Sequence, residues 1–273
     1  MPTMLIFGLG YTATALSRRL RASGWTIRAT GRDGDLDFAD RDAVESALDA
    51  ASHVLSSVPP GDGDPVLAGI APVLRGKWLG YLSSTGVYGD AAGAWVDESA
   101  AIGGGRRTAR SEADRAWQAL GAHVFRLPGI YGPGRSPLDR VRAGAAHRVD
   151  LPGQVFSRVH VEDIVGGVIA ALDAPAEVYN LADDLPASQN AVIDEACRLL
   201  GRDPPPFVAL DRLAPGARAF YAENRRVANL KAKRVLGWRP AYPTFREGLR
   251  ALSAMTSPTS ATTDPATASV LQR

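Results

Sequence analysis

The stretch MLIFGLGYTA, from Met4 to Ala13, decides the fold predicted for this chain. Its apolar start is typical of a buried strand, and it gives way to Gly-Leu-Gly just before a helix-like segment. Gly8 permits a tight turn, Gly10 lets the backbone approach a ligand, and Ala13 keeps helix and strand close. The pattern predicts a dinucleotide site in which the helix start faces a pyrophosphate, with a ligand-free structural turn as the alternative. The cofactor-binding residues expected here are Gly8, Gly10, Tyr11, Thr12 and Ala13.

Strand-like and helix-like segments alternate along much of the chain, which is typical of a parallel sheet with crossover helices. The expected strands are Thr3–Phe7, Thr26–Ala29, His53–Ser57, Trp78–Ser83, His123–Leu127 and Glu177–Leu181. The expected helices are Thr12–Ser23, Arg41–Ala50, Pro65–Arg75, Thr108–Leu120, Glu162–Leu172 and Ala191–Leu200. Loops are expected around Pro137, Pro152 and Pro204 to Pro206. The sequence therefore predicts an α/β fold with a doubly wound parallel sheet of the Rossmann type.

Length and composition favour one domain. The chain has 273 residues, of which 45% are hydrophobic, and a formal net charge of +2. Residues 1–257 are expected to form a single dinucleotide-binding domain, to which residues 132–257 contribute a small substrate lobe. Residues 258–273 have few large apolar side chains, so we expect a disordered tail. No basic leader or membrane-length apolar run occurs, which favours a soluble cytoplasmic protein with no membrane partner.

Other classes of site find little support in the sequence. Basic residues are scattered without interleaved aromatics, so we expect no nucleic-acid partner. The four histidines lie far apart and no Cys/His ligand spacing occurs, so we expect no metal. The single Cys197 falls in a helical pattern, where a thiol packs in the core.

The second strand candidate ends in ATGRDGD, close to the place where dinucleotide sites select the ribose. Arg32 occupies the tip of that segment, and a guanidinium there binds a 2′-phosphate in a forked geometry. Asp33 is adjacent and is able to accept hydrogen bonds from a ribose instead. We therefore expect NADP as the cofactor, with NAD as the alternative; the bland interpretation of Arg32 is a solvated loop charge.

Six further motifs follow in order along the chain. They are DFAD (37–40), LSSTGVYG (82–89), RLPGIYGPG (126–134), VHVEDI (159–164), YNLA (179–182) and LGWRP (236–240). In order and spacing, these motifs resemble those of the extended short-chain dehydrogenase/reductase superfamily, which contains nucleoside-diphosphate-sugar epimerases, dehydratases and reductases. The likeness extends to about Leu252. It implies a small-molecule substrate, and a homodimer as one state of assembly.

The resemblance assigns further cofactor-lining positions. They are Asp37, Phe38, Ser57, Val58, Pro128 and Ile130. Asp37 would accept from the adenine amino group beside the Phe38 backbone, while Ser57 and Val58 would line the cofactor where their strand ends. Pro128 and Ile130 would lie beside the nicotinamide carboxamide.

The resemblance also implies a reacting hydroxyl. Ser84, three residues before Val-Tyr-Gly, matches the Ser/Thr that hydrogen-bonds the reacting hydroxyl or carbonyl in this superfamily. Neighbouring Thr85 is the rival assignment. The structural alternative for both hydroxyls is to cap the end of the strand.

The Tyr and Lys that lie four residues apart in such enzymes have no counterpart here. Thr108 and Glu112 fall at their positions, and no tyrosine of the chain is followed four residues later by lysine. An aliphatic hydroxyl is a far weaker acid than a phenol, and a carboxylate repels an oxyanion. Tyr88 is the preferred substitute acid, although a buried ring with a satisfied hydroxyl is an alternative role. His160 is a further acid/base candidate because a histidine ordinarily titrates near neutrality, but the resemblance places it in a structural motif.

Two functions follow from these residues. The first is an NAD(P)-dependent oxidoreductase or epimerase/dehydratase-like enzyme acting on a polar substrate such as a nucleotide-linked sugar, with Ser84 holding the reacting oxygen. The second is a non-catalytic NADP(H) sensor or regulator, which the missing Tyr and Lys favour. Arg135, Arg142 and Arg148 are either contacts for a substrate phosphate or ordinary surface charges.

Overall fold

The computed structural model describes residues 1–74, 76–105 and 108–256 of the chain. The tail expected at residues 258–273 lies outside the described residues, as does Arg75 at the end of one predicted helix. In the described ranges, no helix combines the length and the apolar character needed to cross a membrane.

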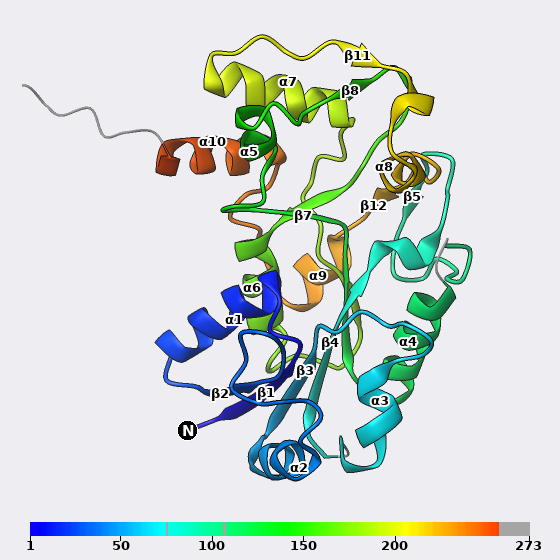
Figure 1. Cartoon of the computed structure of the whole chain (residues 1–273). Helices are drawn as coiled ribbons and strands as arrows, with labels where there is room; N and C mark the ends of the chain where they lie inside the picture. Colours follow the sequence, from blue (N-terminus) through cyan, green and yellow to red (C-terminus); the bar gives the residue numbers. More distant parts are fainter. Residues whose placement is uncertain (75, 106–107, 257–273) are drawn as a thin grey trace, which may run out of the picture.

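A central sheet of six parallel strands has the order β10-β6-β4-β3-β1-β2 (Figure 1). The strands are β1 (Thr3–Phe7), β2 (Thr26–Ala29), β3 (His53–Ser56), β4 (Trp78–Ser84), β6 (His123–Leu127) and β10 (Val178–Asn180). This confirms the predicted doubly wound parallel sheet, and each strand begins and ends within one residue of its expected bounds. Because the sheet is covered on both faces, its inner strands are buried and consist largely of apolar residues.

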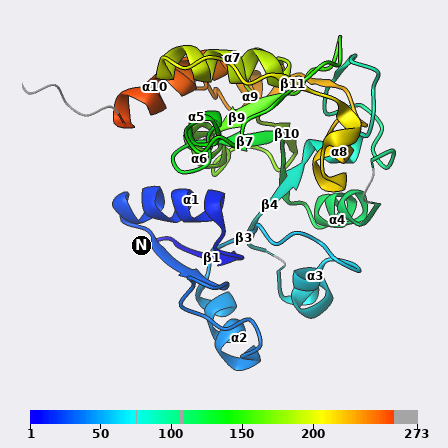
Figure 2. The ribbon, with the colours of Figure 1, turned by 45° about the horizontal axis from the view of Figure 1, so that its top comes forward.

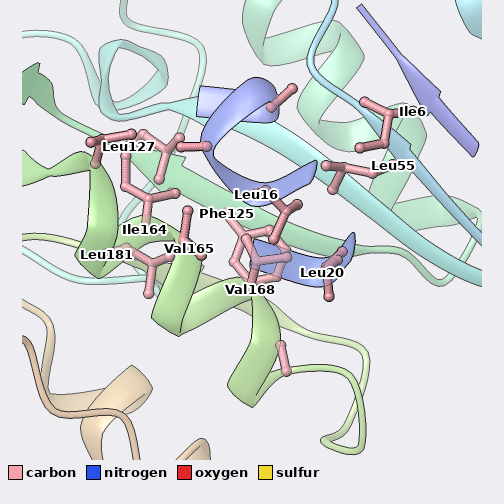
Figure 3. Packing of buried hydrophobic residues seen from close by; sticks show 14 of the residues in the cluster. Ile6, Leu16, Leu20, Leu55, Phe125, Leu127, Ile164, Val165, Val168 and Leu181 are labelled. Carbon is pink, nitrogen blue, oxygen red and sulfur yellow. The ribbon is translucent and has the colours of Figure 1, made fainter. Parts of the chain in front are cut away.

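Helices cover the sheet on both faces, because each carries an apolar stripe. On one face lie α1 (Tyr11–Ala22) and α6 (Val161–Ala170), and on the other α2 (Arg41–Ala50), α3 (Pro65–Ile70) and α4 (Thr108–Ala119). Figure 2 shows α1 on one side of the strands and α2 and α3 on the other. Leu16 and Leu20 of α1 and Val165 and Val168 of α6 gather around Phe125 of β6 (Figure 3).

The predicted helix Pro65–Arg75 is shorter than expected. Asp64 caps α3 by accepting from the backbone N–H of Val66 and Leu67 at 2.9 and 3.0 Å. After Ile70 the chain tightens into a 3₁₀ turn, η1 (Ala71–Leu74), where Pro72 has no N–H to continue the α-helical ladder.

A second group of helices forms the lobe, at the top of Figure 1. It comprises α5 (Pro137–Arg142), α7 (Gln189–Leu200) and α10 (Phe245–Thr256), with β8 (Arg148–Val149) paired to β11 (Phe207–Val208). These helices share an apolar cluster separate from the two that cover the sheet. The loop expected around Pro137 is wrong: Pro137 occupies the first turn of α5, where its missing N–H costs nothing, and Ser136 caps that helix.

Short elements connect the lobe to the sheet. The strand β7 (Gly129–Tyr131) pairs with β9 (Arg158–His160), and β5 (Trp95–Val96) pairs with β12 (Arg226–Val227). The remaining elements are α8 (Pro215–Phe220), α9 (Leu230–Val235), and the 3₁₀ turns η2 (Thr85–Tyr88) and η3 (Leu210–Arg212). The turn η2 continues directly from β4, so the Ser84 segment lies at the carboxyl edge of the sheet.

Candidate functional site

The glycine turn lies at the carboxyl end of β1, where the strand order reverses between β1 and β3. Open α/β sheets bind ligands at this crevice. Gly8 has a φ of +83°, which favours glycine, and a Cβ there would lie 2.9 Å from a Val58 methyl carbon. The backbone N–H of Gly8 donates to the Thr30 hydroxyl at 3.1 Å, and that of Leu9 to the Thr30 carbonyl at 2.8 Å. Contacts with neighbouring strand ends therefore fix the shape of the turn.

The helix that follows the turn begins without a side-chain cap. Gly10 is its N-cap, no acidic residue lies in its first turn, and a Cβ at Gly10 would meet nothing within 4 Å. Thr12 and Ala13 are buried against the sheet, whereas Tyr11 is half-buried. The first N–H groups and the positive end of the helix dipole thus face open space. This arrangement fits the diphosphate of a dinucleotide.

Two of the expected cofactor-lining residues lie against the glycine turn. Ser57 donates its hydroxyl hydrogen to the Gly8 carbonyl oxygen. Val58 packs so closely beside Gly8 that its side chain would collide with any larger residue at that position. The end of β3 therefore forms one wall of the crevice.

The segment that the sequence predicts to select the ribose leaves Arg32 and Asp33 exposed, and neither forms a hydrogen bond or ion pair with the described residues. Asp35, which the sequence reasoning did not single out, holds this loop in place. Its carboxylate accepts from the Ala29 backbone N–H at 2.7 Å and from the Arg28 side chain at 2.5 Å. Arg32 therefore keeps its donors available for an anion.

Asp37 and Phe38 lie on the surface next to the end of β1. Asp37 accepts from the Ala39 backbone N–H at 2.9 Å, which fixes a local turn. The Phe38 ring meets the Phe7 ring edge-on, with 5.8 Å between centroids, and remains 40% exposed. The two residues thus bound the crevice on the side of β2.

Ser84 ends β4 and caps η2, because its hydroxyl oxygen accepts from the Gly86 backbone N–H at 3.1 Å. This is the capping role that the sequence left open. The same hydroxyl retains its own hydrogen for donation to a ligand. Thr85 is buried, so of the two candidates Ser84 is the more accessible.

Beneath Ser84 lies a buried set of polar side chains that we call the Arg126 network. Its members are Ser83, Tyr88, Asp114, Arg126 and Asn180. The Arg126 guanidinium binds both oxygens of Asp114, at 3.1 and 2.8 Å, and Ser83 donates to the same carboxylate at 2.5 Å. Burial lowers the pKa of Arg126, but its contacts with Asp114 and Tyr88 together outweigh burial and the pKa is raised overall.

The Tyr88 hydroxyl is fully engaged in this network. It donates to the Asn180 side-chain oxygen at 2.8 Å and accepts from Arg126 at 2.9 Å. Burial raises the pKa of Tyr88 to about 12, although Arg126 opposes the shift. As it stands, the phenol has neither a free hydrogen nor the acidity for proton transfer near neutral pH.

Pro128 and Ile130 flank the crevice on the side of β6, and both are half-buried. Ile130 lies in β7, directly opposite Val159 of β9. The pairing of β7 with β9 therefore sets the position of the expected nicotinamide contacts.

The two positions at which the resemblance leads one to expect Tyr and Lys lie on the surface of α4. Thr108 is the first residue of the helix, and Glu112 lies one turn further along; both are exposed. Glu112 lines an open groove of about 490 Å³ together with Asp62 and Asp64, between the starts of α3 and α4. Carboxylates, not a lysine, therefore border this side.

A second buried polar group, which we call the seam cluster, joins the lobe to the sheet and was not expected as a unit. Its members are Tyr131, Arg158, His160 and Asp183. The Tyr131 hydroxyl, His160 Nε2 and Asp183 Oδ2 are buried without a hydrogen-bond partner. Arg158 donates to the carbonyls of Phe156 and Ala187, both at 2.8 Å, instead of to a carboxylate.

Burial shifts every titratable group of the seam cluster. It raises the pKa of Asp183 to about 8, against the opposing charge of Arg158, and lowers the pKa of Arg158 to about 10. It also lowers the pKa of His160 to about 4 and raises that of Tyr131 far above its usual range. His160 caps α6 through Nδ1, which accepts from the Glu162 backbone N–H at 3.2 Å. A neutral, structural His160 follows from this geometry.

In the part of the chain that the structure describes, no three His, Cys, Asp or Glu side chains come together to hold a metal ion.

The three arginines considered as phosphate contacts differ in their surroundings. Arg148 and Arg142 lie in ion pairs with Asp194 and Asp139 at 3.2 and 3.4 Å. Arg135 instead lies beside Tyr11, with its guanidinium carbon 5.6 Å from the ring centroid.

Comparison with solved structures of low sequence identity supports the fold. The human epimerase family protein SDR39U1, solved with NADPH, matches with a TM-score of 0.73 and 17% identity over 92% of this chain and 99% of that one. The dTDP-glucose 4,6-dehydratase of Bacillus anthracis, solved in complex with NAD, matches with a TM-score of 0.73 and 16% identity over 93% and 96%. These neighbours share the fold of NAD(P)-dependent epimerase/dehydratase-like short-chain dehydrogenase/reductases.

No protein-family model matches the chain. Two individual proteins, however, are more similar to it in sequence than the structures above. A functionally unknown conserved protein from Silicibacter pomeroyi DSS matches with a TM-score of 0.83 and 41% identity over 94% of this chain and 100% of that one. Protein YeeZ of Escherichia coli strain K12 is 30% identical over 247 residues, which cover 76% of this chain and 87% of YeeZ. The chain therefore belongs to the same family as Protein YeeZ.

Proposed function

We propose that the chain binds a nicotinamide dinucleotide at the glycine turn, with NADP preferred to NAD. We further propose that it acts as an oxidoreductase or epimerase/dehydratase-like enzyme on a polar small molecule such as a nucleotide-linked sugar. The observation that carries this proposal is the open, uncapped start of α1 at the crevice between β1 and β3. Solved structures of the same fold with NAD and NADPH support the choice of ligand.

The preference for NADP rests on Arg32. Its exposed guanidinium has no partner among the described residues, so it is available to bind a 2′-phosphate through charge-assisted hydrogen bonds. Replacement by alanine, Arg32→Ala, is expected to weaken NADPH binding about tenfold or more and to leave NADH binding unchanged. Arg19→Ala, on the exposed side of α1, is the control for the loss of one positive charge. An unchanged ratio of the two affinities would contradict this assignment.

A bound nicotinamide supplies the acceptor or donor for hydride transfer. In the chain itself, Ser84 retains a hydroxyl hydrogen for the reacting oxygen of the substrate. Tyr88 holds the end of β4 in position through Arg126 and Asn180 and does not move a proton. Because Tyr88 is engaged and Thr108 and Glu112 lie exposed on α4, proton transfer is left to solvent water beside Ser84.

Those two exposed residues also favour a second candidate function, a sensor that binds NADP(H) without turnover. Thr108 is too weak an acid to replace a phenol, and Glu112 would repel a developing oxyanion. A sensor needs the glycine turn and Arg32 but makes no use of the Ser84 hydroxyl.

Turnover and binding separate the two candidates. Purified protein is incubated with NADPH, or with the oxidised cofactor, and a panel of sugar nucleotides and simple carbonyl compounds, and cofactor absorbance and products are followed. An oxidoreductase should oxidise NADPH with at least one compound, whereas an epimerase/dehydratase-like enzyme should convert a sugar nucleotide without net oxidation of the cofactor. Either activity should be lost in Ser84→Ala. Ser188→Ala, which removes the capping serine of α7 in the lobe, is the matched control. NADPH binding without turnover across the panel, unaffected by Ser84→Ala, would favour the sensor.

A further inference from the structure

An arginine outside the glycine turn lies beside the open start of α1. The Arg135 guanidinium carbon is 5.6 Å from the centroid of the Tyr11 ring, and Tyr11 is the first residue of the helix after Gly10. The Tyr11 hydroxyl donates to the Pro133 carbonyl at 3.1 Å. The segment that carries Arg135 is therefore attached directly to the residue that opens the helix.

The backbone of this segment is also held in place. Gly132 and Arg135 exchange two backbone hydrogen bonds, at 3.2 and 3.0 Å, which close a tight turn. A Cβ at Gly132 would lie 2.6 Å from the Tyr11 hydroxyl and 2.7 Å from a Val161 methyl carbon, so only glycine fits between them. The turn thus presents Arg135 from a defined position between the sheet and the lobe helix α5.

The charge of Arg135 is not neutralised by the chain. Arg135 is exposed and forms no ion pair with the described residues, and the first turn of α1 contains no acidic residue. The carboxylates that act on Tyr11 are engaged elsewhere: Glu162 pairs with Arg18 at 3.0 Å, and Asp139 accepts from the Ser136 backbone N–H in the capping box of α5 and pairs with Arg142. A free guanidinium and the positive end of a helix dipole therefore meet at one place, which favours an anion there.

We propose that Arg135 binds the diphosphate of the dinucleotide beside the open start of α1, next to Tyr11. This inference rests on the proposed function and deepens it. Arg32 would read the 2′-phosphate, which only NADP carries, whereas Arg135 would bind the diphosphate that NADP and NAD share. The cofactor is then held between the first helix of the sheet and the turn that leads into the lobe.

The assignment is tested by calorimetric binding titrations with three ligands: NADPH, NADH and adenosine 2′-monophosphate, which lacks the diphosphate. Arg135→Gln keeps much of the side-chain length and removes the charge. It is expected to weaken NADPH and NADH by the same factor, about 10- to 100-fold, and to leave adenosine 2′-monophosphate unchanged. Arg135→Lys should recover part of the loss, since lysine restores the charge but lacks the planar, bidentate donors of a guanidinium. Arg19→Gln, at the other end of α1, is the charge-matched control.

The outcomes separate this inference from the function on which it rests. If the wild-type chain binds neither dinucleotide, the proposed function fails and this inference fails with it. If the wild type binds both and Arg135→Gln binds them equally well, this inference alone is overturned. A loss restricted to NADPH would place Arg135 at the 2′-phosphate and would also overturn it. Circular dichroism and thermal unfolding of each variant confirm that the fold is retained.

Discussion

The Arg126 network and the seam cluster are both buried, polar and charged, but they differ in how completely their atoms are paired. In the network, Arg126 binds both oxygens of Asp114 and the Tyr88 hydroxyl both donates and accepts. In the seam cluster, Tyr131, His160 and Asp183 each keep one polar atom buried without a hydrogen bond. Burial alone therefore does not tell what a polar side chain contributes.

The difference follows from where each group lies. The network joins β4, β6, α4 and β10 beneath Ser84, and a fully satisfied set of charge-assisted bonds holds one geometry. The seam cluster lies where β7 and β9 meet the lobe, and its unpaired atoms cost free energy. We therefore expect the lobe to open at the seam at a lower free energy than the sheet opens at the network.

The largest effect is expected from breaking the network. Asp114→Ala leaves the Arg126 guanidinium buried, at 2% exposure, without its carboxylate. The variant should lose about 3–5 kcal/mol of unfolding free energy, measured by denaturant titration. Arg18→Ala removes one partner of the exposed pair with Glu162 and should cost about 0.2–1 kcal/mol. A loss at Asp114 no larger than that at Arg18 would mean that the network is not a stabilising unit.

The seam cluster should show itself in the pH dependence of stability. Burial raises the pKa of Asp183 from 3.8 to about 8, so the unfolded chain ionises first and stability falls as pH rises between these values. Wild type should lose about 2–3 kcal/mol from this group between pH 5 and pH 7, and Asp183→Asn should remove that slope. His160 acts in the opposite direction, because its pKa is lowered from 6.5 to about 4 and stability is lost as pH falls through that range.

The difference between wild type and Asp183→Asn isolates the carboxyl, since His160 is common to both. Chemical denaturation at several pH values between 4 and 8 gives the two curves. Asp203→Asn, at an exposed position, is the control and should leave the wild-type slope unchanged. Parallel curves for wild type and Asp183→Asn would be incompatible with a buried neutral carboxyl.

Much of the sheet is predictable from sequence because its signals are local. Most strands are short segments rich in apolar residues and bounded by glycine or polar residues, and the glycine turn carries its own fingerprint. The helix α5 was missed because Pro137 was interpreted as a breaker, whereas proline is well tolerated in the first turn of a helix. The pairing of β7 with β9 was missed because three-residue strands show no readable alternation.

The roles of the seam cluster and of Arg135 cannot be predicted from short stretches of sequence. Tyr131 and Asp183 are more than fifty residues apart, and their burial depends on α10, whose Gly248 leaves room for the Tyr131 ring. Arg135 resembles any surface arginine until Tyr11 is found beside it. Such groups arise from the docking of the lobe, which no single stretch of sequence encodes.

Two tyrosine variants compare the clusters directly, because each removes one hydroxyl. Tyr88→Phe removes the hydroxyl that Arg126 Nη1 and the Asn180 side-chain oxygen share, and should cost about 1.5–3 kcal/mol. Tyr131→Phe removes a buried hydroxyl that has no partner, so it should raise the free energy of unfolding by about 1–3 kcal/mol. Equal losses in denaturant titrations would mean that the Tyr131 hydroxyl is hydrogen-bonded in solution, which would erase the contrast between the clusters.

The smallest effects distinguish two adjacent serines at the end of β4. Ser83 donates to the buried Asp114 carboxylate at 2.5 Å, so Ser83→Ala should cost about 1.5 kcal/mol. Ser84 makes only the cap contact with Gly86 at 3.1 Å, so Ser84→Ala should cost about 0.5–1 kcal/mol. If the Ser84 hydroxyl binds a ligand, Ser84→Ala should lose much more turnover or ligand affinity than its small loss of unfolding free energy would explain. The reverse order of stabilities would move Ser84 into the network, and its hydroxyl would then no longer be free to act on a substrate.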